Sequence, residues 1–374
     1  MRIGIDCRLW NQTGVGRYIR NLVVNLAEID RANDYVLFVR KEDLESVKLC
    51  VSNQNWRIVA ADIRWHSIEE QIKFSGILDK EKLDLVHFPY FSIPLFYNKP
   101  YVLTIHDLII HHFPTGKAST LFPVFYYLKF YSYKFLMYSA AKKAKKIIAP
   151  SISTKEEIID HLDINSEKVI VTYEAVDEKI SGAKKIEDLP KEYFLYVGNA
   201  YPHKNLDRLL EAFSQFSKEN VNVKLVLVGT NDFFYIRLNK NIKKLQLEDK
   251  IIVKSEISDA ELSYLYKNAL GLVTPALMEG FGLPVLEALK SKCLVICSDI
   301  PAFKELSRGS ALYFNPYEVS SIKDRLKYAY ENHGKEEIKE IIKKGYELSE
   351  KFSWKKMASE TLKVYESSIG LRQS

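Results

Sequence analysis

Two glutamates flank a glycine-rich segment in the second half of the sequence, a combination that can bind a polar ligand. Glu279 and Glu287 are eight positions apart, and the residues between them are Gly-Phe-Gly-Leu-Pro-Val-Leu. Gly280 and Gly282 let backbone amides approach a ligand closely. A helix that starts near Pro284 would add the oriented N–H groups of its N-terminus, which favour an anion. The segment therefore predicts an anion-binding loop.

The spacing also predicts how the two carboxylates are placed. On a continuous helical ladder, Glu279 and Glu287 would lie near one face. Glu287 falls within the apolar run Val-Leu-Glu-Ala-Leu, where a carboxylate that faces away from water needs a partner. Helix physics alone leaves an alternative open, in which both are ordinary solvated glutamates on either side of a loop.

A lysine at another strand-to-helix turn could neutralise the anion. Lys204 ends the segment Val-Gly-Asn-Ala-Tyr-Pro-His-Lys, which follows an apolar run. A bound diphosphate needs compensating positive charge. We therefore expect Lys204 and the Glu279 loop to converge on one pocket that faces the N-terminal half of the chain. The alternative is a solvated lysine on a turn.

The first half of the sequence carries a glycine-rich turn of its own. Gly14, Gly16 and Arg17 follow the first apolar run and lead into a helical pattern. Taken alone, this turn invites a dinucleotide-binding interpretation. The fingerprint is incomplete, because Ile19 occupies the third glycine position and the next strand ends in Arg40 without an acidic residue for a ribose.

A histidine and an aspartate follow a later apolar run of the first half. His106 and Asp107 would lie at the carboxyl edge of a sheet, where α/β folds place ligands. The alternative is a structural His–Asp pair. His111 and His112 come next, but no carboxylate cluster accompanies the three histidines, so no metal site is predicted.

Length and pattern predict two α/β domains. The chain has 374 residues and is 47% hydrophobic, enough for two cores. Strand-like runs alternate with helical patterns, which indicates βαβ units and mainly parallel sheets. The expected domains are residues 1–180 and 190–353, joined by a polar linker at 178–191, and a last helix within 354–374 is expected to pack back on the first domain. The strands that we expect are 3–7, 35–39, 85–88, 101–105, 146–149, 193–197, 224–229, 251–253, 271–274 and 294–297.

Composition favours a cytoplasmic protein. The sequence opens directly on a short apolar strand rather than on a leader pattern, and no run is long enough to span a bilayer. The four cysteines, Cys7, Cys50, Cys293 and Cys297, are too few and too scattered for a disulfide framework. We expect a reduced, cytosolic protein that could touch the inner face of the cell membrane.

Membrane contact is suggested by a basic, aromatic stretch at residues 117–146. Residues 116–146 hold seven lysines and no acidic residue. Aromatic rings at the headgroup level and lysines on anionic lipid are typical of an interfacial surface. The alternative is a partly buried helix with a solvated basic end. Nucleic acid is not expected as a partner, because nothing resembles a nucleic-acid-binding module.

The motif Glu-Gly-Phe-Gly-Leu-Pro followed by a second Glu resembles the hallmark of family 4 retaining glycosyltransferases. This resemblance covers nearly the whole chain and implies the GT-B fold, in which two Rossmann-like domains with parallel sheets face each other across a cleft. It implies that Glu279 contacts the donor sugar, that Glu287 accepts hydrogen bonds from the ribose and that Lys204 neutralises the diphosphate. An arginine that usually helps this lysine is replaced here, since Asn199 and His203 stand where it commonly occurs.

The resemblance extends these roles along the chain. It implies that His106 hydrogen-bonds the transferred sugar, so the expected catalytic residues are His106, Lys204 and Glu279. Asp107 and Arg17 are expected to bind the acceptor. The expected donor-binding residues are Gly14, Gly16, Asn199, His203, Gly229, Thr230, Ile257, Gly280, Phe281, Gly282, Leu283 and Glu287.

The same resemblance suggests the substrates. The sequence His-His-Phe-Pro after Ile110 is similar to mannosyltransferases of bacterial or archaeal polysaccharide synthesis, which favours GDP-mannose as donor and a glycan or lipid-linked saccharide as acceptor. No cofactor is expected. Metal-independent transfer is expected, since the chain has no Asp-any-Asp triplet to hold a metal ion. Two rival functions are a non-catalytic nucleotide-sugar-binding subunit, motivated by the missing arginine, and an NAD(P)-dependent oxidoreductase.

Overall fold

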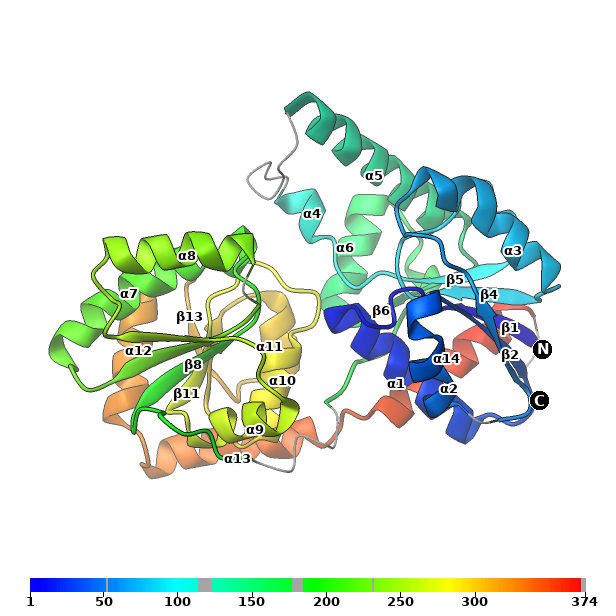
Figure 1. The fold of residues 1–374 in the computed structure, drawn as a ribbon. Coiled ribbons are helices and arrows are strands. Elements are labelled where there is room, and N and C mark those ends of the chain that lie inside the picture. Colours follow the sequence, from blue (N-terminus) through cyan, green and yellow to red (C-terminus); the bar gives the residue numbers. More distant parts are fainter. Residues whose placement is uncertain (52, 114–122, 177–183, 231, 371–374) are drawn as a thin grey trace. The chain divides into compact units, whose positions relative to one another are not determined.

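The computed structural model describes residues 1–370 except 52, 114–122, 177–183 and 231. Among these residues the chain forms two compact units. Unit 1 contains residues 1–113, 123–174 and 353–370, and unit 2 contains residues 175–352. Each unit is built on a parallel sheet with helices on its faces (Figure 1), which confirms the predicted α/β class with two Rossmann-like domains.

Unit 1 contains a seven-stranded sheet in the order β3-β2-β1-β4-β5-β6-β7, and every neighbouring pair is parallel. Its strands are β1 (Arg2–Asp6), β2 (Asp34–Val39), β3 (Trp56–Ala60), β4 (Leu85–Phe88), β5 (Tyr101–Thr104), β6 (Lys146–Ala149) and β7 (Val169–Val171). Its helices are α1 (Thr13–Ile29), α2 (Leu44–Cys50), α3 (Ser75–Lys80), α4 (Ile109–His112), α5 (Pro123–Lys143), α6 (Ile152–Leu162) and α14 (Trp354–Ser368).

Unit 2 contains a six-stranded parallel sheet in the order β10-β9-β8-β11-β12-β13. Its strands are β8 (Tyr193–Val197), β9 (Lys224–Val228), β10 (Ile251–Lys254), β11 (Gly271–Thr274), β12 (Val295–Ser298) and β13 (Leu312–Phe314). Its helices are α7 (Leu206–Glu219), α8 (Phe233–Lys244), α9 (Asp259–Asn268), α10 (Leu283–Lys290), α11 (Pro301–Ser307), α12 (Val319–Glu331) and α13 (Glu336–Ser349).

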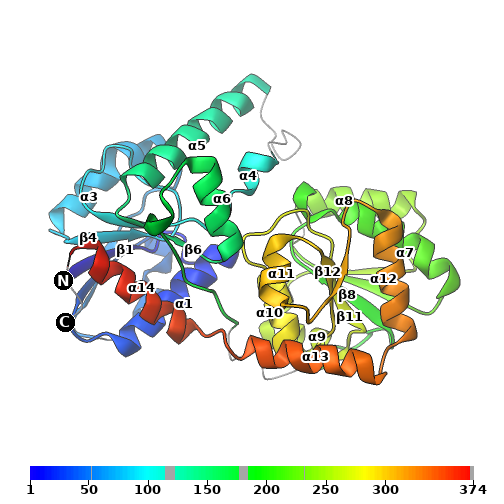
Figure 2. The ribbon, with the colours of Figure 1, turned by 180° about the vertical axis from the view of Figure 1, so that it is seen from behind.

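The strand order of unit 2 reverses between β8 and β11. Strands β9 and β10 extend the sheet on one side of β8, whereas the chain crosses back to β11 and continues outward on the other side. Helices α7 and α8 therefore cover one face, and α9, α10 and α11 cover the opposite face (Figures 1 and 2). Loops at the carboxyl ends of β8 and β11 diverge at this reversal, which is where open α/β sheets bind ligands.

The C-terminal helix α14 belongs to unit 1, where it packs against α1, β5 and β6 (Figure 2). A buried hydrogen-bond chain ties it to the sheet. The Tyr365 hydroxyl lies 2.6 Å from Nδ1 of His87, and Nε2 of His87 lies 2.7 Å from Oγ1 of Thr104. Burial, and then the charge of His106, lowers the pKa of His87 to about 3. His87 is therefore a neutral imidazole that needs both partners.

Among the described helices, none combines the length and apolar character that a bilayer span requires.

Tyr365→Phe should lower the free energy of unfolding of the protein by about 1–3 kcal/mol, because it leaves Nδ1 of a fully buried imidazole without its partner. Chemical denaturation measures the change. Tyr131→Phe is the matched control, since Tyr131 is 65% exposed on α5 of the same unit. Equal stabilities of the two variants would contradict the structural role of this hydrogen bond.

Candidate functional site

A pocket in unit 2 lies at the point where the strand order reverses. The carboxyl ends of β8 and β11, the turn after β8 and the start of α10 form its wall. Its lining residues are Tyr196, Val197, Lys204, Thr274, Glu279, Gly282, Pro284, Val285 and Phe303. The pocket thus includes the lysine and the first glutamate that the sequence placed in two separate motifs.

Lys204 and Glu279 form an ion pair in this pocket. Lys204 Nζ donates a hydrogen bond to Oε1 of Glu279. The two side chains are only 15% and 13% exposed, so solvent screens the pair less than it screens a surface salt bridge. The structure therefore brings the expected cation and carboxylate together, 75 residues apart in the chain.

Hydrogen bonds between the two loops hold Lys204 and Glu279 close together. The turn Pro202–Lys204 and the loop after β11 are joined by a backbone hydrogen bond from Leu277 N to His203 O of 2.8 Å. Asn205, next in the chain, donates from Nδ2 to the carbonyls of Pro275 at 3.0 Å and Pro316 at 2.8 Å. Its φ of 59° lies in the left-handed region, which asparagine tolerates better than most residues. Sequence reasoning did not single out Asn205.

Gly282 shapes the start of α10. It is the residue before the helix and has a φ of 105°, a conformation that side chains rarely adopt. A Cβ there would also lie 2.9 Å from the Phe303 ring. Pro284 occupies the first turn of the helix, where its missing N–H costs nothing. Glycine at 282 is thus required by backbone conformation and by packing together.

Glu287 occupies a different environment from Glu279. It lies on α10, is 3% exposed and accepts a 2.8 Å hydrogen bond from the Tyr266 hydroxyl of α9. This confirms that the carboxylate needs a buried partner. The expectation that both glutamates share one helical face is wrong, because Glu279 precedes α10 and lies in the loop.

Asn199 and His203, the two residues at the position where an arginine was expected, supply no second cation beside Lys204. Burial, together with the charge of Lys204, lowers the pKa of His203 to about 3, so its imidazole is neutral at physiological pH. The Asn199 carbonyl accepts a 2.6 Å hydrogen bond from the Tyr196 hydroxyl, and its Oδ1 accepts one from Tyr201 N at 3.3 Å. Asn199 thus holds the shape of the turn.

The remaining expected donor-binding residues of unit 2 lie between β11 and α10 or at the first residue of α10, directly after β9, and just before α9. Gly280 is buried beside Glu279, Phe281 packs against Phe352 with ring centroids 6.1 Å apart, and Leu283 is the first residue of α10. Gly229 and Thr230 follow β9. Ile257 precedes Ser258, which caps α9.

Gly229 has a packing role as well, because a Cβ there would lie 2.2 Å from the Tyr235 hydroxyl. Gly229, Thr230 and Ile257 lie beyond the lining of the pocket around Lys204 that the described residues form.

Gly14, Gly16 and Arg17 lie near the start of α1, in unit 1. The two glycines differ. A Cβ on Gly16 would come within 2.5 Å of the Trp10 carbonyl, whereas a Cβ on Gly14 would meet no atom within 4 Å. Gly16 is therefore needed for close backbone packing, and Gly14 leaves the backbone open to a ligand.

His106 follows β5, and both of its ring nitrogens have partners within unit 1. Nε2 donates to the Pro89 carbonyl at 2.9 Å, and Nδ1 lies 3.0 Å from Oε1 of Glu174. Burial alone would lower its pKa, but the hydrogen bond and charge of Glu174, with the Pro89 carbonyl, outweigh burial and raise the pKa above its ordinary value. An imidazolium paired with a carboxylate is the form that these contacts favour.

Asp107 and the later histidines occupy separate positions. Asp107 Oδ1 accepts a 3.0 Å hydrogen bond from Ile109 N and holds the start of α4. His111 packs edge-on against Tyr133. His112 lies 2.6 Å from Oε2 of Glu157 on α6. The sequence near the histidines shows no carboxylate cluster, and this single carboxylate comes from 45 residues further along the chain.

The basic, aromatic stretch contains helix α5, and residues 117–122 of it lie outside the described residues. One face of α5 exposes large apolar side chains at helical spacing. They are Tyr127, Leu128, Tyr131, Phe135 and Tyr138, between 45% and 65% exposed. Lys134 lies 4.9 Å from the Phe130 ring centroid and Lys142 lies 5.3 Å from that of Tyr138. The helix is also partly buried, at Met137, Ala140 and Ala141, so both interpretations of this stretch stay open.

Comparison with known proteins agrees with this architecture. Residues 12–179 match the family model described as Glycosyltransferase Family 4, and residues 177–348 match the model described as Glycosyl transferases group 1. The chain is 31% identical to O-antigen chain mannosyltransferase RfbU of Salmonella typhimurium over 263 residues, which cover 70% of this chain and 68% of that protein. It is 25% identical to O-antigen chain mannosyltransferase B of Escherichia coli, over 94% of this chain and 96% of that protein.

Solved structures show the same fold. Sucrose-phosphate synthase of Thermosynechococcus elongatus superposes with a TM-score of 0.77 at 17% identity, over 98% of both chains. WaaG, a glycosyltransferase involved in lipopolysaccharide biosynthesis, superposes with a TM-score of 0.72 at 14% identity, over 99% of this chain and 100% of its own. These likenesses confirm the expected GT-B fold.

Glu174→Gln should lower the pKa of His106, because it removes the carboxylate that outweighs burial. A histidine whose folded pKa is raised contributes stability that is fully present below its unfolded pKa of about 6.5 and is lost as pH rises through the folded pKa. The loss of stability in Glu174→Gln should therefore be larger at pH 6 than at pH 9.

NMR titration of the His106 ring and denaturation at the two pH values measure these effects. Glu167→Gln, an exposed carboxylate of unit 1 away from His106, should change neither quantity. A His106 titration that is the same in Glu174→Gln as in the unmodified protein would contradict the assigned ion pair.

Proposed function

This chain belongs to family 4 of the glycosyltransferases, and we propose that it transfers mannose from GDP-mannose to a glycan or lipid-linked saccharide with retention of anomeric configuration. Two of its relatives, at 31% and 25% identity, carry the name O-antigen chain mannosyltransferase. The sequence His-His-Phe-Pro after Ile110 supports the same sugar. In the proposed reaction, the bond between the anomeric carbon and the diphosphate breaks and GDP leaves with the electron pair. The acceptor hydroxyl oxygen forms the new bond to the anomeric carbon, and its proton passes to the departing diphosphate.

The observation that carries the proposal is the Lys204–Glu279 pair in the pocket of unit 2. A pyrophosphate that enters this pocket would compete with the carboxylate for the ammonium group, because phosphate oxygens form strong charge-assisted hydrogen bonds. Lys204 would then exchange Glu279 for the diphosphate and stabilise the leaving group. Glu279, released from the lysine, would accept hydrogen bonds from hydroxyls of the donor sugar.

The surrounding groups would complete the donor site. The amides of residues 280–283 at the start of α10 would face the sugar and phosphates, as an oriented helix N-terminus favours anions. Glu287, already held by Tyr266, would bind the ribose hydroxyls. Gly229, Thr230 and Ile257 would contact the base. Because His203 is neutral and Asn199 holds the turn, Lys204 would supply the positive charge that this turn contributes.

Unit 1 would supply the acceptor side. We propose that Gly14 and Gly16 contact the donor phosphates through backbone groups and that Arg17 and Asp107 bind the acceptor. His106 would donate a hydrogen bond to the transferred sugar after giving up its bond to the Pro89 carbonyl. Its raised pKa favours the protonated form, which can donate from one nitrogen while the other stays on Glu174.

Transfer would proceed without a metal ion or other cofactor. The proposed charge compensation comes from Lys204 and from backbone amides, and the chain has no Asp-any-Asp triplet of the kind that holds a metal ion on a nucleotide sugar. Catalysis would then rest on positioning and electrostatic stabilisation of the departing diphosphate.

A lipid-linked acceptor would be reached at the inner face of the cell membrane. The exposed face of α5, from Tyr127 to Tyr138, would insert its rings at the headgroup level, and the lysines of residues 134–146 would contact anionic lipid. We propose a cytoplasmic enzyme that docks peripherally through this helix, and nucleic acid is not among its proposed partners.

Purified protein should release GDP from GDP-mannose faster than nucleoside diphosphate from other nucleotide sugars, and should extend a saccharide acceptor. Lys204→Met and Glu279→Gln should each lower kcat by about 100- to 1,000-fold with the fold unchanged, because each removes a group that meets developing charge. A coupled assay for released nucleoside diphosphate measures the donor preference and the kcat of each variant.

Lys339→Met is the matched control, since it breaks an exposed Lys–Glu pair of unit 2 and should leave turnover unchanged. Full activity of Lys204→Met would refute the assigned role of the pair. Tight donor binding without any turnover would instead support a non-catalytic nucleotide-sugar-binding subunit.

Vesicles with anionic lipid should sediment the protein at low salt, and vesicles of zwitterionic lipid should sediment much less of it. Replacing Tyr131 and Phe135 of α5 together by serine should weaken this binding. The matched control replaces Phe233 and Ile236, which are 60% and 53% exposed on α8, and should bind as the unmodified protein does. If anionic vesicles fail to sediment the protein at low salt, membrane docking through α5 is wrong.

A further inference from the structure

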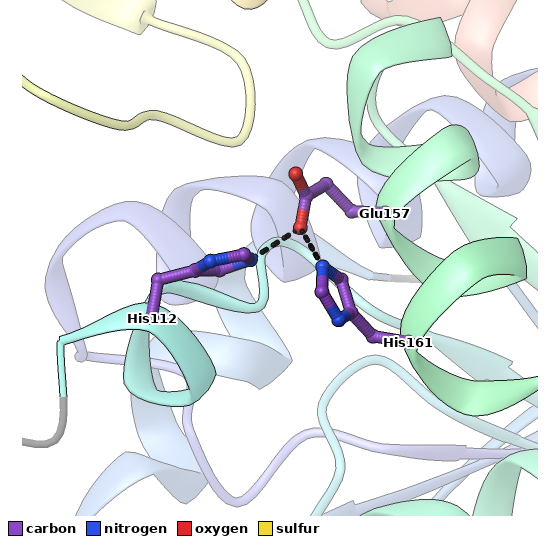
Figure 3. Close-up of side chains that lie close together, drawn as sticks. All are labelled: His112, Glu157 and His161. Carbon is purple, nitrogen blue, oxygen red and sulfur yellow. Dashed lines mark hydrogen bonds and ion pairs between the residues drawn. The ribbon is translucent and has the colours of Figure 1, made fainter.

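Three metal-ligating side chains meet on the surface of unit 1, outside the residues proposed for sugar transfer. Helix α6 presents Glu157 and His161 one turn apart, and α4 ends on His112 opposite them (Figure 3). Nε2 of His112 lies 2.6 Å from Oε2 of Glu157, and Nε2 of His161 lies 3.2 Å from the same oxygen. All candidate ligand atoms lie within 4.8 Å of one another.

The chemistry of this trio suits zinc. Two imidazoles and one carboxylate form a recognised Zn²⁺ ligand set, with the fourth position of the tetrahedron left to water or another ligand. At bond lengths of about 2.0–2.1 Å, two ligand atoms of a tetrahedral site lie about 3.3 Å apart. The His161 contact already has this spacing, and the His112 contact would need to open by less than about 1 Å.

Both histidines contact the same carboxylate oxygen of Glu157, and a bound ion would replace the protons in these two contacts. A carboxylate oxygen can only accept, so each imidazole donates its Nε2 proton toward Glu157. A metal ion would take the place of these protons between the nitrogens and the oxygen. The side chains of His112, Glu157 and His161 are 33%, 30% and 42% exposed, so an ion can reach them from solvent.

We propose that His112, Glu157 and His161 form a Zn²⁺ site that cross-links α4 to α6. The site would fix the segment that begins at His106, because Asp107 holds the start of α4 and the Thr154 hydroxyl of α6 lies 3.4 Å from the His106 carbonyl. The ion would thus stabilise and position a loop of unit 1. None of its ligands takes part in the proposed sugar transfer, so the two proposals stand separately.

Isothermal titration of ZnCl₂ into the full-length, untagged protein after chelator treatment should show one equivalent bound per chain. Co²⁺ in its place should give visible absorption bands of a low-symmetry site. Zn²⁺ should raise the midpoint of thermal unfolding, since a ligand that binds the folded state stabilises it. His112→Gln, Glu157→Gln and His161→Gln should each lose the stoichiometric binding and the thermal shift, with unchanged circular dichroism.

His333→Gln is the matched control, because it removes an exposed histidine of unit 2 and should bind Zn²⁺ as the unmodified protein does. Absence of stoichiometric binding in the unmodified protein would overturn the proposal. Binding that survives in all three cluster variants would also overturn it, because the ion would then lie elsewhere.

Discussion

The pairing of Lys204 with Glu279 is the interaction on which the pocket of unit 2 depends. Both side chains are mostly buried, and a charge in that position is costly unless it has a partner. The backbone bond between Leu277 and His203 and the Asn205 side chain hold the two loops together. The pair therefore places a cation and an anion side by side where strands β8 and β11 diverge. A ligand with both phosphates and hydroxyls can bind the cation through its phosphates and the anion through its hydroxyls.

Several residues of this site could be predicted from short motifs in the sequence. Gly282, Lys204 and Glu279 stand out because each belongs to a short motif whose residue types suggest a function without reference to distant parts of the chain. The contacts that hold the site together cannot be recognised in this way, because they join residues far apart in the chain. Asn205 donates a hydrogen bond to the carbonyl of Pro316, 111 residues away, and Glu287 accepts one from Tyr266 on another helix. The pairing of His112 with Glu157 was missed for the same reason, because only folding brings α4 and α6 together.

The strand predictions succeeded where strands are buried on both faces, whereas three edge strands of the described sheets, β3, β7 and β13, were missed. Central strands such as β5 and β11 are uninterrupted apolar runs. The edge strand β3 is only half-buried and mixes polar with apolar residues, and the edge strands β7 and β13 have three residues each. Such segments carry too little periodicity to be recognised.

The protonation states of His87 and His106 could not be predicted from the sequence either. Burial keeps His87 neutral, whereas Glu174, 68 residues from His106 in the chain, favours the charged form of His106.

A crystal structure of the protein with GDP-mannose bound would show whether Lys204 exchanges Glu279 for the donor diphosphate. We expect Lys204 Nζ to leave Glu279 and to lie within hydrogen-bond distance of a diphosphate oxygen, while Glu279 accepts a hydrogen bond from a sugar hydroxyl. A donor bound at another surface, with the Lys204–Glu279 pair intact and its pocket unchanged, would contradict it.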